Sequence, residues 1–327
     1  MLYFQRESKV FISIIVPVYD EVENLPLLQG SLDEVLKTYA YEIVYVNDGS
    51  TDGSDVVLEG LASKDPEHVR VIEFRRNFGQ TAAIAAGIEK SSGDVLVTLD
   101  ADLQNDPEDI PLLLAKIDEG YDLVSGWRKD RKDAFLTRTI PSRLANWLIS
   151  RFTGVSLHDY GCTLKAYRRE VLEGFHLYGE MHRFIPAYAG GVGAKILEVP
   201  VHHHPRRFGK AKYGLERTAK VLLDLFTVKF LISYSKKPIY LFGGAGLFLV
   251  GLSMIDLVVL IIRRITPPFE HMIRSPLLLM SVMLFILGFQ SILLGLLAEL
   301  TVRTYYESQS KPTYTIRKII NPSAQER

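Results

Sequence analysis

The sequence has very little cysteine and lacks the glycine-rich motifs of common nucleotide-binding folds. Its 327 residues include a single cysteine, Cys162, so no intrachain disulfide can form and a disulfide-stapled secreted scaffold is excluded. No apolar segment opens the chain, and we expect no cleaved secretory signal. No Gly-x-Gly-x-x-Gly follows the first predicted strand, and no Gly-Lys-Ser/Thr occurs. Both absences disfavour a dinucleotide-binding Rossmann domain and a P-loop NTPase.

The formal net charge is zero, but the charges are unevenly distributed. Residues 1–120 hold 23 acidic and 9 basic side chains, whereas residues 201–240 hold 9 basic and only 2 acidic ones. Nucleic-acid binding needs a continuous basic face, so the acidic first part predicts no nucleic-acid partner. A short basic stretch beside an apolar region favours an anionic membrane surface.

Two long apolar runs lie near the end of the sequence. The first, 239–262, has 24 residues and one charge, Asp256, and the second, 277–297, has 21 residues and no charge. Each exceeds the roughly 20 residues that cross a bilayer core. A buried core helix is the alternative, but two such runs in one short chain favour a transmembrane hairpin. Basic residues flanking the hairpin predict that both chain ends lie on the cytoplasmic side.

We therefore predict four parts. They are a cytoplasmic domain over 9–212, amphipathic juxtamembrane helices over 213–237, two transmembrane helices within 238–298, and a cytoplasmic C-terminal tail over 299–327. Segments 215–235 and 142–152 both carry apolar and basic residues at helical spacing. Such helices either lie in the plane of the headgroups or pack on the domain, and the sequence leaves both open.

Short β-branched runs alternate with longer helical segments in the first part of the chain. The runs are 12–18, 42–46, 69–74, 95–99 and 123–125, and the helical segments are 25–38, 54–64, 81–90 and 107–119. This alternation predicts an α/β fold with a mostly parallel sheet flanked by helices. Ligands of such sheets bind beyond the carboxyl ends of the strands.

Acidic motifs fall at three of these predicted strand ends. They are Tyr19-Asp20-Glu21, Asn47-Asp48-Gly49-Ser50 and Asp100-Ala101-Asp102. Because alternate residues of an extended segment point the same way, Asp100 and Asp102 can share one Mg²⁺ or Mn²⁺ ion, and Gln104 can add a carbonyl oxygen. Hard divalent ions prefer oxygen ligands and share them with substrate phosphates. The pair therefore predicts a metal-bound diphosphate in place of a glycine-rich cradle.

Longer motifs identify a family. The segments 16–21, 47–54, 76–80, 100–104, 159–169 and 201–204 resemble the signatures of family-2 glycosyltransferases with a GT-A fold. Together with the two apolar runs, they resemble the polyisoprenyl-phosphate glycosyltransferases, which include dolichol-phosphate mannose synthases and the GtrB and ArnC enzymes. The resemblance covers about residues 9–320.

The resemblance implies an inverting, metal-dependent transfer of a sugar from a nucleotide-diphosphate sugar, with UDP the expected nucleotide, to undecaprenyl or another polyprenyl phosphate. It also implies a homotetramer in the inner membrane that serves cell-envelope glycan or lipid modification. The implied nucleotide-binding residues are Pro17, Tyr19, Glu21, Asp48 and Asp100, and the implied metal ligands are Asp100, Asp102 and Gln104. Three positions depart from the family pattern: Asp20 replaces a common asparagine, Asn47 precedes the usual aspartate before Gly49, and Ala211 replaces a serine in the later basic loop.

Basic residues are the candidates for bringing two phosphate-bearing substrates together. Arg128, with Arg138 and Ser142 four residues apart on the next helix, is predicted to hold the acceptor phosphate. The loop after His204 supplies further candidates for the diphosphate: Arg206, Arg207, Lys210 and Lys212. The predicted catalytic residues are Asp102, Arg128 and Asp159. Asp159 can orient a substrate, act as a base, or be a plain turn carboxylate, and the sequence does not decide among these roles.

The sequence leaves alternatives for the three consecutive histidines and for the function as a whole. Consecutive residues in an extended segment point to alternate sides, so His202-His203-His204 favours a phosphate contact over a zinc site. A processive polysaccharide synthase is disfavoured because the Gln-x-x-Arg-Trp motif is absent. An inactive nucleotide-sugar-binding scaffold is disfavoured by the intact pair Asp100 and Asp102. Glucose, N-acetylglucosamine, mannose and formylated aminoarabinose donors remain open.

Overall fold

A computed structural model describes most of the chain. The described residues are 10–129, 146, 149–151, 153–172, 177, 181–205, 207–208, 239–266, 275–308 and 314–322. They fall into two compact units, Met1–Val228 with Pro312–Arg327, and Lys229–Lys311. The predicted juxtamembrane helices over 213–237 and most of 142–152 lie outside the described residues.

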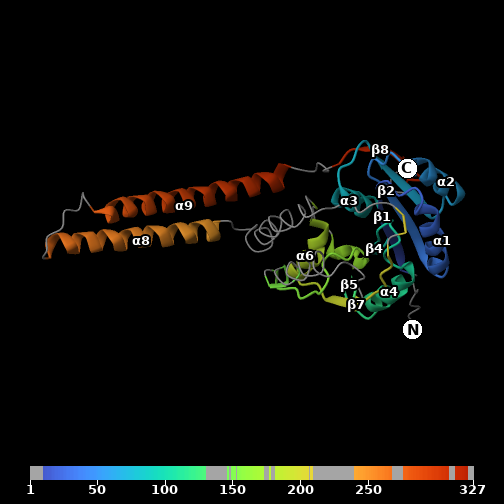
Figure 1. The fold of residues 1–327 in the computed structure, drawn as a ribbon, viewed down its shortest axis with the longest axis horizontal. Helices are drawn as coiled ribbons and strands as arrows, with labels where there is room; N and C mark the ends of the chain where they lie inside the picture. The colour runs from blue at the N-terminus through green and yellow to red at the C-terminus, as the bar shows by residue number, and fades with distance from the viewer. Residues whose placement is uncertain are drawn as a thin grey trace, which may run out of the picture. The chain divides into compact units, whose positions relative to one another are not determined.

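Within the described residues, the first unit contains one eight-stranded sheet in the order β7-β5-β6-β4-β1-β2-β3-β8 (Figure 1). Its strands are β1 Phe11–Val18, β2 Ala40–Asn47, β3 Val69–Phe74, β4 Val95–Thr98, β5 Leu123–Trp127, β6 Lys165–Arg168, β7 Ile196–Pro200 and β8 Ile316–Ile320. All neighbouring pairs are parallel except those made by β6 and β8. The predicted mostly parallel sheet is confirmed.

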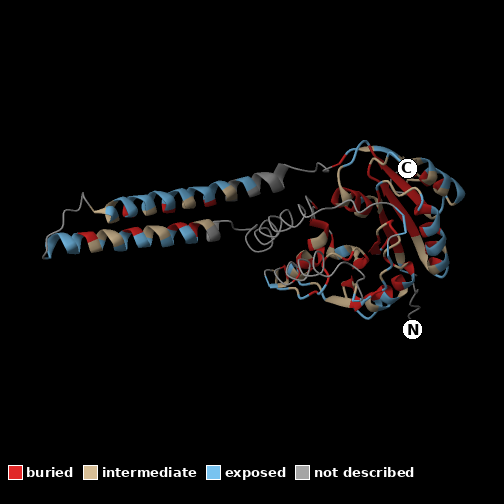
Figure 2. Ribbon diagram, in the orientation of Figure 1, coloured by how far each residue is buried: buried red, intermediate tan, exposed pale blue. Residues whose placement is uncertain are grey.

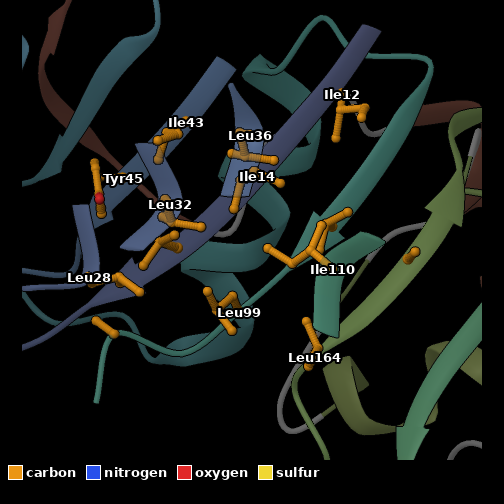
Figure 3. Packing of buried hydrophobic residues seen from close by; sticks show 14 of the residues in the cluster. Ile12, Ile14, Leu28, Leu32, Leu36, Ile43, Tyr45, Leu99, Ile110 and Leu164 are labelled. Carbon is orange, nitrogen blue, oxygen red and sulfur yellow. The ribbon is translucent and has the colours of Figure 1, made fainter. Parts of the chain in front are cut away.

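Helices connect the strands in the predicted α/β alternation. They are α1 Leu25–Leu36, α2 Ser54–Lys64, α3 Gln80–Lys90, α4 Ile110–Asp118 and α6 Ile185–Gly191, with short 3₁₀ segments η1 Pro107–Asp109, η3 Arg169–Val171 and η4 Met181–Phe184. Leucines at four-residue spacing make one face of α1 apolar, and Leu28, Leu32 and Leu36 are fully buried against the sheet (Figure 3). This spacing places side chains on one helix face.

The sheet is buried on both faces, as its near-continuous apolar strands require. Along β2, Ile43 and Tyr45 belong to the core that includes α1, whereas Val44 and Val46 belong to a second core with Ala83 and other residues of α3. Figure 2 shows the strands coloured as buried throughout the centre of the sheet. Such burial leaves the strand ends as the place for polar chemistry.

The second unit is a pair of antiparallel helices, α8 Ile239–Ile265 and α9 Pro276–Ser308. Both are long and apolar enough to cross a membrane, and only 17% and 11% of the residues in their most apolar windows are buried within the protein. Small residues bring the helices together: Ser253 and Ser281 each donate a hydroxyl to the other's carbonyl oxygen, at 2.8 and 3.0 Å. The two predicted C-terminal apolar helices are confirmed.

The C-terminal segment returns to the sheet of the first unit. There β8 pairs antiparallel with β3, and the Tyr314 ring stacks on Phe74 with centroids 5.0 Å apart. The Asn321 amide donates to the carbonyl oxygens of Ala62 and Val69, at 2.9 Å each. The sequence predicts only a tail here, because this strand is short and two of its five residues are charged.

Candidate active site

The loops after β1 and β2 are joined by hydrogen bonds at the carboxyl edge of the sheet. Asp20, with φ 50°, donates its backbone N–H to the Ser50 hydroxyl at 3.0 Å and accepts the Thr51 N–H at 2.8 Å. This pairing holds the backbone at Asp20, between Tyr19 and Glu21. Tyr19, one of the predicted nucleotide-binding residues, is 36% exposed. Pro17 lies just before it, within β1.

Asp48 links the loop after β2 to the loop after β3. Its carboxylate accepts the backbone N–H groups of Phe78 at 2.7 Å and Gly79 at 2.9 Å. Burial raises the pKa of Asp48, and these two bonds act in the opposite direction. Gly49 is required beside it, because a Cβ on that residue, with φ +70°, would lie 2.6 Å from the carbonyl carbon of Arg76. The carboxylate predicted to bind the nucleoside thus already fixes a neighbouring loop.

The predicted metal motif follows β4 directly. Asp100 is half-buried and accepts the side-chain amide of Gln80 at 2.7 Å. Asp102 is buried and accepts the backbone N–H of Gln104 at 3.1 Å. Burial, and then the charge of Asp102, raise the pKa of Asp100 to about 6. Two carboxylates that oppose each other's ionisation in this way favour a shared cation.

The residues present fit a divalent ion that is shared with a substrate. Among the residues that the structure describes, no group of three or more His, Cys, Asp or Glu side chains could hold a metal ion by itself. Mg²⁺ commonly binds one or two carboxylates and completes its coordination with water and substrate phosphates. Asp100 and Asp102 supply such a pair, so phosphate oxygens would complete the coordination.

Arg128 and Asp159 form a buried ion pair next to this motif. The Nε and Nη2 atoms of Arg128 lie 2.7 and 3.0 Å from the two carboxylate oxygens of Asp159. The Asp159 backbone N–H in turn donates to Glu198 at 2.9 Å. Burial opposes the charge of Arg128, but the carboxylate of Asp159 more than offsets it and raises the pKa of the guanidinium. Two of the predicted catalytic residues are therefore direct partners.

Lys165 is a candidate site residue that sequence reasoning missed. It begins β6, is only 3% exposed, and donates to the carbonyl oxygens of Cys162 and Tyr160. Burial lowers its pKa, and its charge acts on Asp100. The sequence does contain a signal for this residue, namely a lysine inside the otherwise apolar run 164–167. This pattern predicts a buried cation only when a carboxylate cluster is known to face it.

The histidine segment contacts carboxylates of the loop after the metal motif. His202 pairs with Asp109 and His204 with Asp106, each with nitrogen and oxygen 2.8 Å apart. Neither imidazole is part of a metal-binding group among the described residues. The sequence suggested only a zinc site or a phosphate contact for these histidines. It did not predict that two of them would pair with carboxylates.

Most of the predicted phosphate ligands belong to segments outside the part of the chain that the structure describes. Arg138, Ser142, Arg206, Lys210 and Lys212 lie outside the described residues. Arg207 is described and exposed. The acceptor clamp and the basic loop therefore stay predictions.

Comparisons with known proteins agree with this arrangement. The model of the glycosyl transferase family 2 matches residues 13–175. A dodecaprenyl-phosphate galacturonate synthase from Rhizobium johnstonii is 41% identical over 319 residues, which cover 96% of this chain and 94% of that protein.

Solved structures of glucosyl-3-phosphoglycerate synthase from Mycobacterium tuberculosis share the fold. One, a complex with Mn²⁺, UDP and glucosyl-3-phosphoglycerate, has a TM-score of 0.50 at 18% identity and covers 68% of this chain and 80% of that chain. Another, with Mn²⁺, UDP and phosphoglyceric acid, has a TM-score of 0.51 at 17% identity, with coverage of 68% and 78%. With its match to the family model and its similarity to a dodecaprenyl-phosphate galacturonate synthase over nearly its whole length, the chain belongs to glycosyl transferase family 2 and is a glycosyltransferase.

Proposed function

We propose that the protein transfers a sugar from a UDP-sugar to a polyprenyl phosphate, with inversion at the anomeric carbon. One observation carries the proposal: the similarity to a polyprenyl-phosphate sugar synthase covers 96% of the chain. Coverage this complete includes the strand-end carboxylates and also α8 and α9, which together form 60 residues of the chain. A soluble acceptor would not require two such helices.

The donor would bind across the ends of β1, β2 and β4. Tyr19, Glu21 and Asp48 line the first two strand ends and are our candidates for the nucleoside. Asp100, Asp102 and Gln104 would hold Mg²⁺ or Mn²⁺ on the diphosphate. When bound, such an ion supplies positive charge to the leaving diphosphate. Gln80, which already donates to Asp100, would keep that carboxylate oriented.

The acceptor is an anion before the reaction begins. A phosphate monoester has a second pKa of about 6, so it attacks without a strong general base, and the role of Asp159 as a base is not required. Instead, Asp159 holds the guanidinium of Arg128 in place through two bonds. Those bonds use two of the five N–H donors of arginine, so the pair is compatible with a phosphate contact by Arg128.

The location follows from the lipid acceptor and from the helices. We propose that α8 and α9 anchor the enzyme in the inner membrane, with the catalytic unit on the cytoplasmic side, where the basic flanks of the hairpin favour it. The homotetramer implied by the family resemblance belongs to the same proposal. Crosslinking of the full chain in membranes would test it.

Product analysis tests the function. The purified full chain would be incubated with undecaprenyl phosphate, Mn²⁺ and one nucleotide sugar at a time, starting with UDP-galacturonic acid and continuing with the glucose, N-acetylglucosamine, mannose and formylated aminoarabinose donors. We expect one donor to give a lipid-extractable product with the mass of a single added sugar, and EDTA to abolish it. A polymeric product would support a processive synthase, and metal-dependent binding without turnover would support a scaffold.

A further inference from the structure

Residues 201–204 connect two parts of the candidate active site. The backbone N–H of Val201 donates to the carbonyl oxygen of Trp127 at 3.0 Å, just before Arg128. The backbone N–H of His204 donates to the carbonyl oxygen of Gln104 at 2.9 Å, within the metal motif. The segment therefore runs from the end of β5 to the loop that follows β4.

Two side-chain pairs hold this segment on the same loop. Asp109 binds His202 twice, accepting the imidazole Nδ1 at 2.8 Å and the backbone N–H at 2.7 Å. Asp106 accepts Nε2 of His204 at 2.8 Å with one oxygen and the backbone N–H of Glu108 at 3.0 Å with the other. We call the pairs His202–Asp109 and His204–Asp106 the histidine clasp.

The two side chains of the His202–Asp109 pair differ strongly in how far they are exposed. The Asp109 side chain is only 7% exposed, whereas that of His202 is 75% exposed. Burying a carboxylate is costly unless it is hydrogen-bonded, and both oxygens of Asp109 accept from the same histidine residue. The Asp109 carboxylate thus uses both of its oxygens to hold the segment 201–204.

The clasp also sets the start of the chain that follows. Residue 204 is fixed to Gln104, so the residues after it, including the exposed Arg207, begin beside the metal motif. A cationic group that starts from a fixed point loses less conformational freedom when it binds an anion. The same bond restrains the backbone of Gln104, next to Asp102.

We propose that His202, His204, Asp106 and Asp109 are positioning residues whose clasp is required for tight binding of a nucleoside diphosphate with a divalent ion. The inference rests on the proposed function, because that function supplies the ligand. In this proposal, the three-histidine motif binds neither a metal nor the substrate. Its role is to align the segment after β7 with the metal motif.

Paired substitutions test the hydrogen bonds separately from the imidazole rings. His202→Asn and His204→Gln place an amide nitrogen near the positions of Nδ1 and Nε2, whereas His202→Ala and His204→Ala remove the donors. The dissociation constant of UDP at saturating Mn²⁺ would be measured by calorimetry on the full chain in detergent. We expect the alanine variants to bind UDP roughly three- to tenfold more weakly, the effect of one hydrogen bond. The amide variants should stay within about twofold of wild type.

His68 provides a matched control. It pairs with Asp65 at 3.0 Å just before β3, away from the carboxyl ends of the strands. His68→Ala removes the same kind of pair and should leave UDP binding unchanged. The Michaelis constant for the polyprenyl phosphate should also stay unchanged in the clasp variants, whereas that for the donor rises.

The outcomes separate the clasp from the function on which it rests. Unchanged UDP binding in both alanine variants would overturn the clasp, and so would amide variants as weak as the alanine ones, because the imidazole itself would then be needed. If the wild type itself binds no UDP with Mn²⁺, the proposed function fails, and the clasp fails with it.

Discussion

The guanidinium of Arg128 and the carboxylate of Asp159 form a two-point ion pair at the end of β5, with contacts of 2.7 and 3.0 Å. The two side chains are only 13% and 4% exposed. The residue predicted to hold the acceptor phosphate is thus oriented by the residue whose role the sequence leaves open. A two-point pair fixes the plane of a guanidinium as well as its position.

Removing Asp159 should destabilise the catalytic unit. Asp159→Ala leaves a buried guanidinium without its partner, and breaking such a pair costs about 3–5 kcal/mol. Denaturant unfolding of the full chain in detergent measures this loss. The exposed pair of Lys116 and Glu119 is the control, since Glu119→Ala should cost less than about 1 kcal/mol. Equal stability of Asp159→Ala and wild type would contradict the assignment.

Asp102→Ala should remove metal-dependent turnover and leave the fold intact. The substitution deletes one of the two carboxylates proposed to hold the ion. Mutating a residue that only hydrogen-bonds to a metal ligand typically lowers metal affinity or activity about 10–100-fold. Because Asp102 is proposed to be a ligand itself, we expect turnover to fall at least about 100-fold at any Mn²⁺ concentration. Product formation over a Mn²⁺ titration is the measurement, with Asp118→Ala on the exposed end of α4 as the control. Near-normal activity would refute the metal assignment.

The bonds made by Asp52 should make stability depend on pH in acid. Partial burial opposes the charge of Asp52, but hydrogen bonds from Ser54 and Val22 lower its pKa. A lowered folded pKa means that the stabilisation is complete above the unfolded value of about 3.9 and is lost as pH falls through the folded value. The Tm difference between wild type and Asp52→Ala should therefore be constant from pH 8 to about 5 and shrink below about pH 4. A difference that grows in acid would contradict the sign.

Deleting residues 312–327 should expose the edge of β3. That edge is paired with β8, and an open apolar edge promotes association with other chains. We expect a lower Tm and increased light scattering on heating. Deletion of residues 323–327 keeps β8 and is the matched control. A truncated protein that stays monodisperse and as stable as wild type would show that β8 contributes little.

Gly246→Leu should separate the two long helices. A Cβ on Gly246 would lie 2.5 Å from the carbonyl oxygen of Gly288, whereas a Cβ on Gly244 would meet nothing within 4 Å. Overpacking of this kind costs about 1–3 kcal/mol. Thermal unfolding in detergent should show a loss for Gly246→Leu and almost none for Gly244→Leu. Equal effects of the two changes would mean that the helices do not meet at this face.

The central parallel strands could be predicted because their signal is local. Apolar runs such as 12–18 and 95–99 mark buried parallel strands, and their ends carry the acidic motifs that the structure places at one edge. The family motifs then identified the glycosyltransferase correctly. Local patterns suffice wherever strand, loop and chemistry follow one another along the chain.

The remaining features depend on residues that are far apart in sequence. Arg128 and Asp159 are 31 positions apart, His202 and Asp109 93 positions apart, and Tyr314 and Glu89 225 positions apart. Nothing in the spacing of these residues distinguishes a partner from a solvated side chain. The antiparallel β6 was missed for a related reason: it has only four residues, two of them basic.

The position of β8 has a consequence for biosynthesis. Among the described strands of this sheet it is the last to leave the ribosome, and both long apolar helices are made before it. The β3 edge must therefore remain open while α8 and α9 are synthesised, although the residues that build most of the sheet have already been made. A nascent chain arrested between α9 and β8 would hold both long apolar helices but an incomplete sheet, so a complete sheet forms only after both helices have been translated.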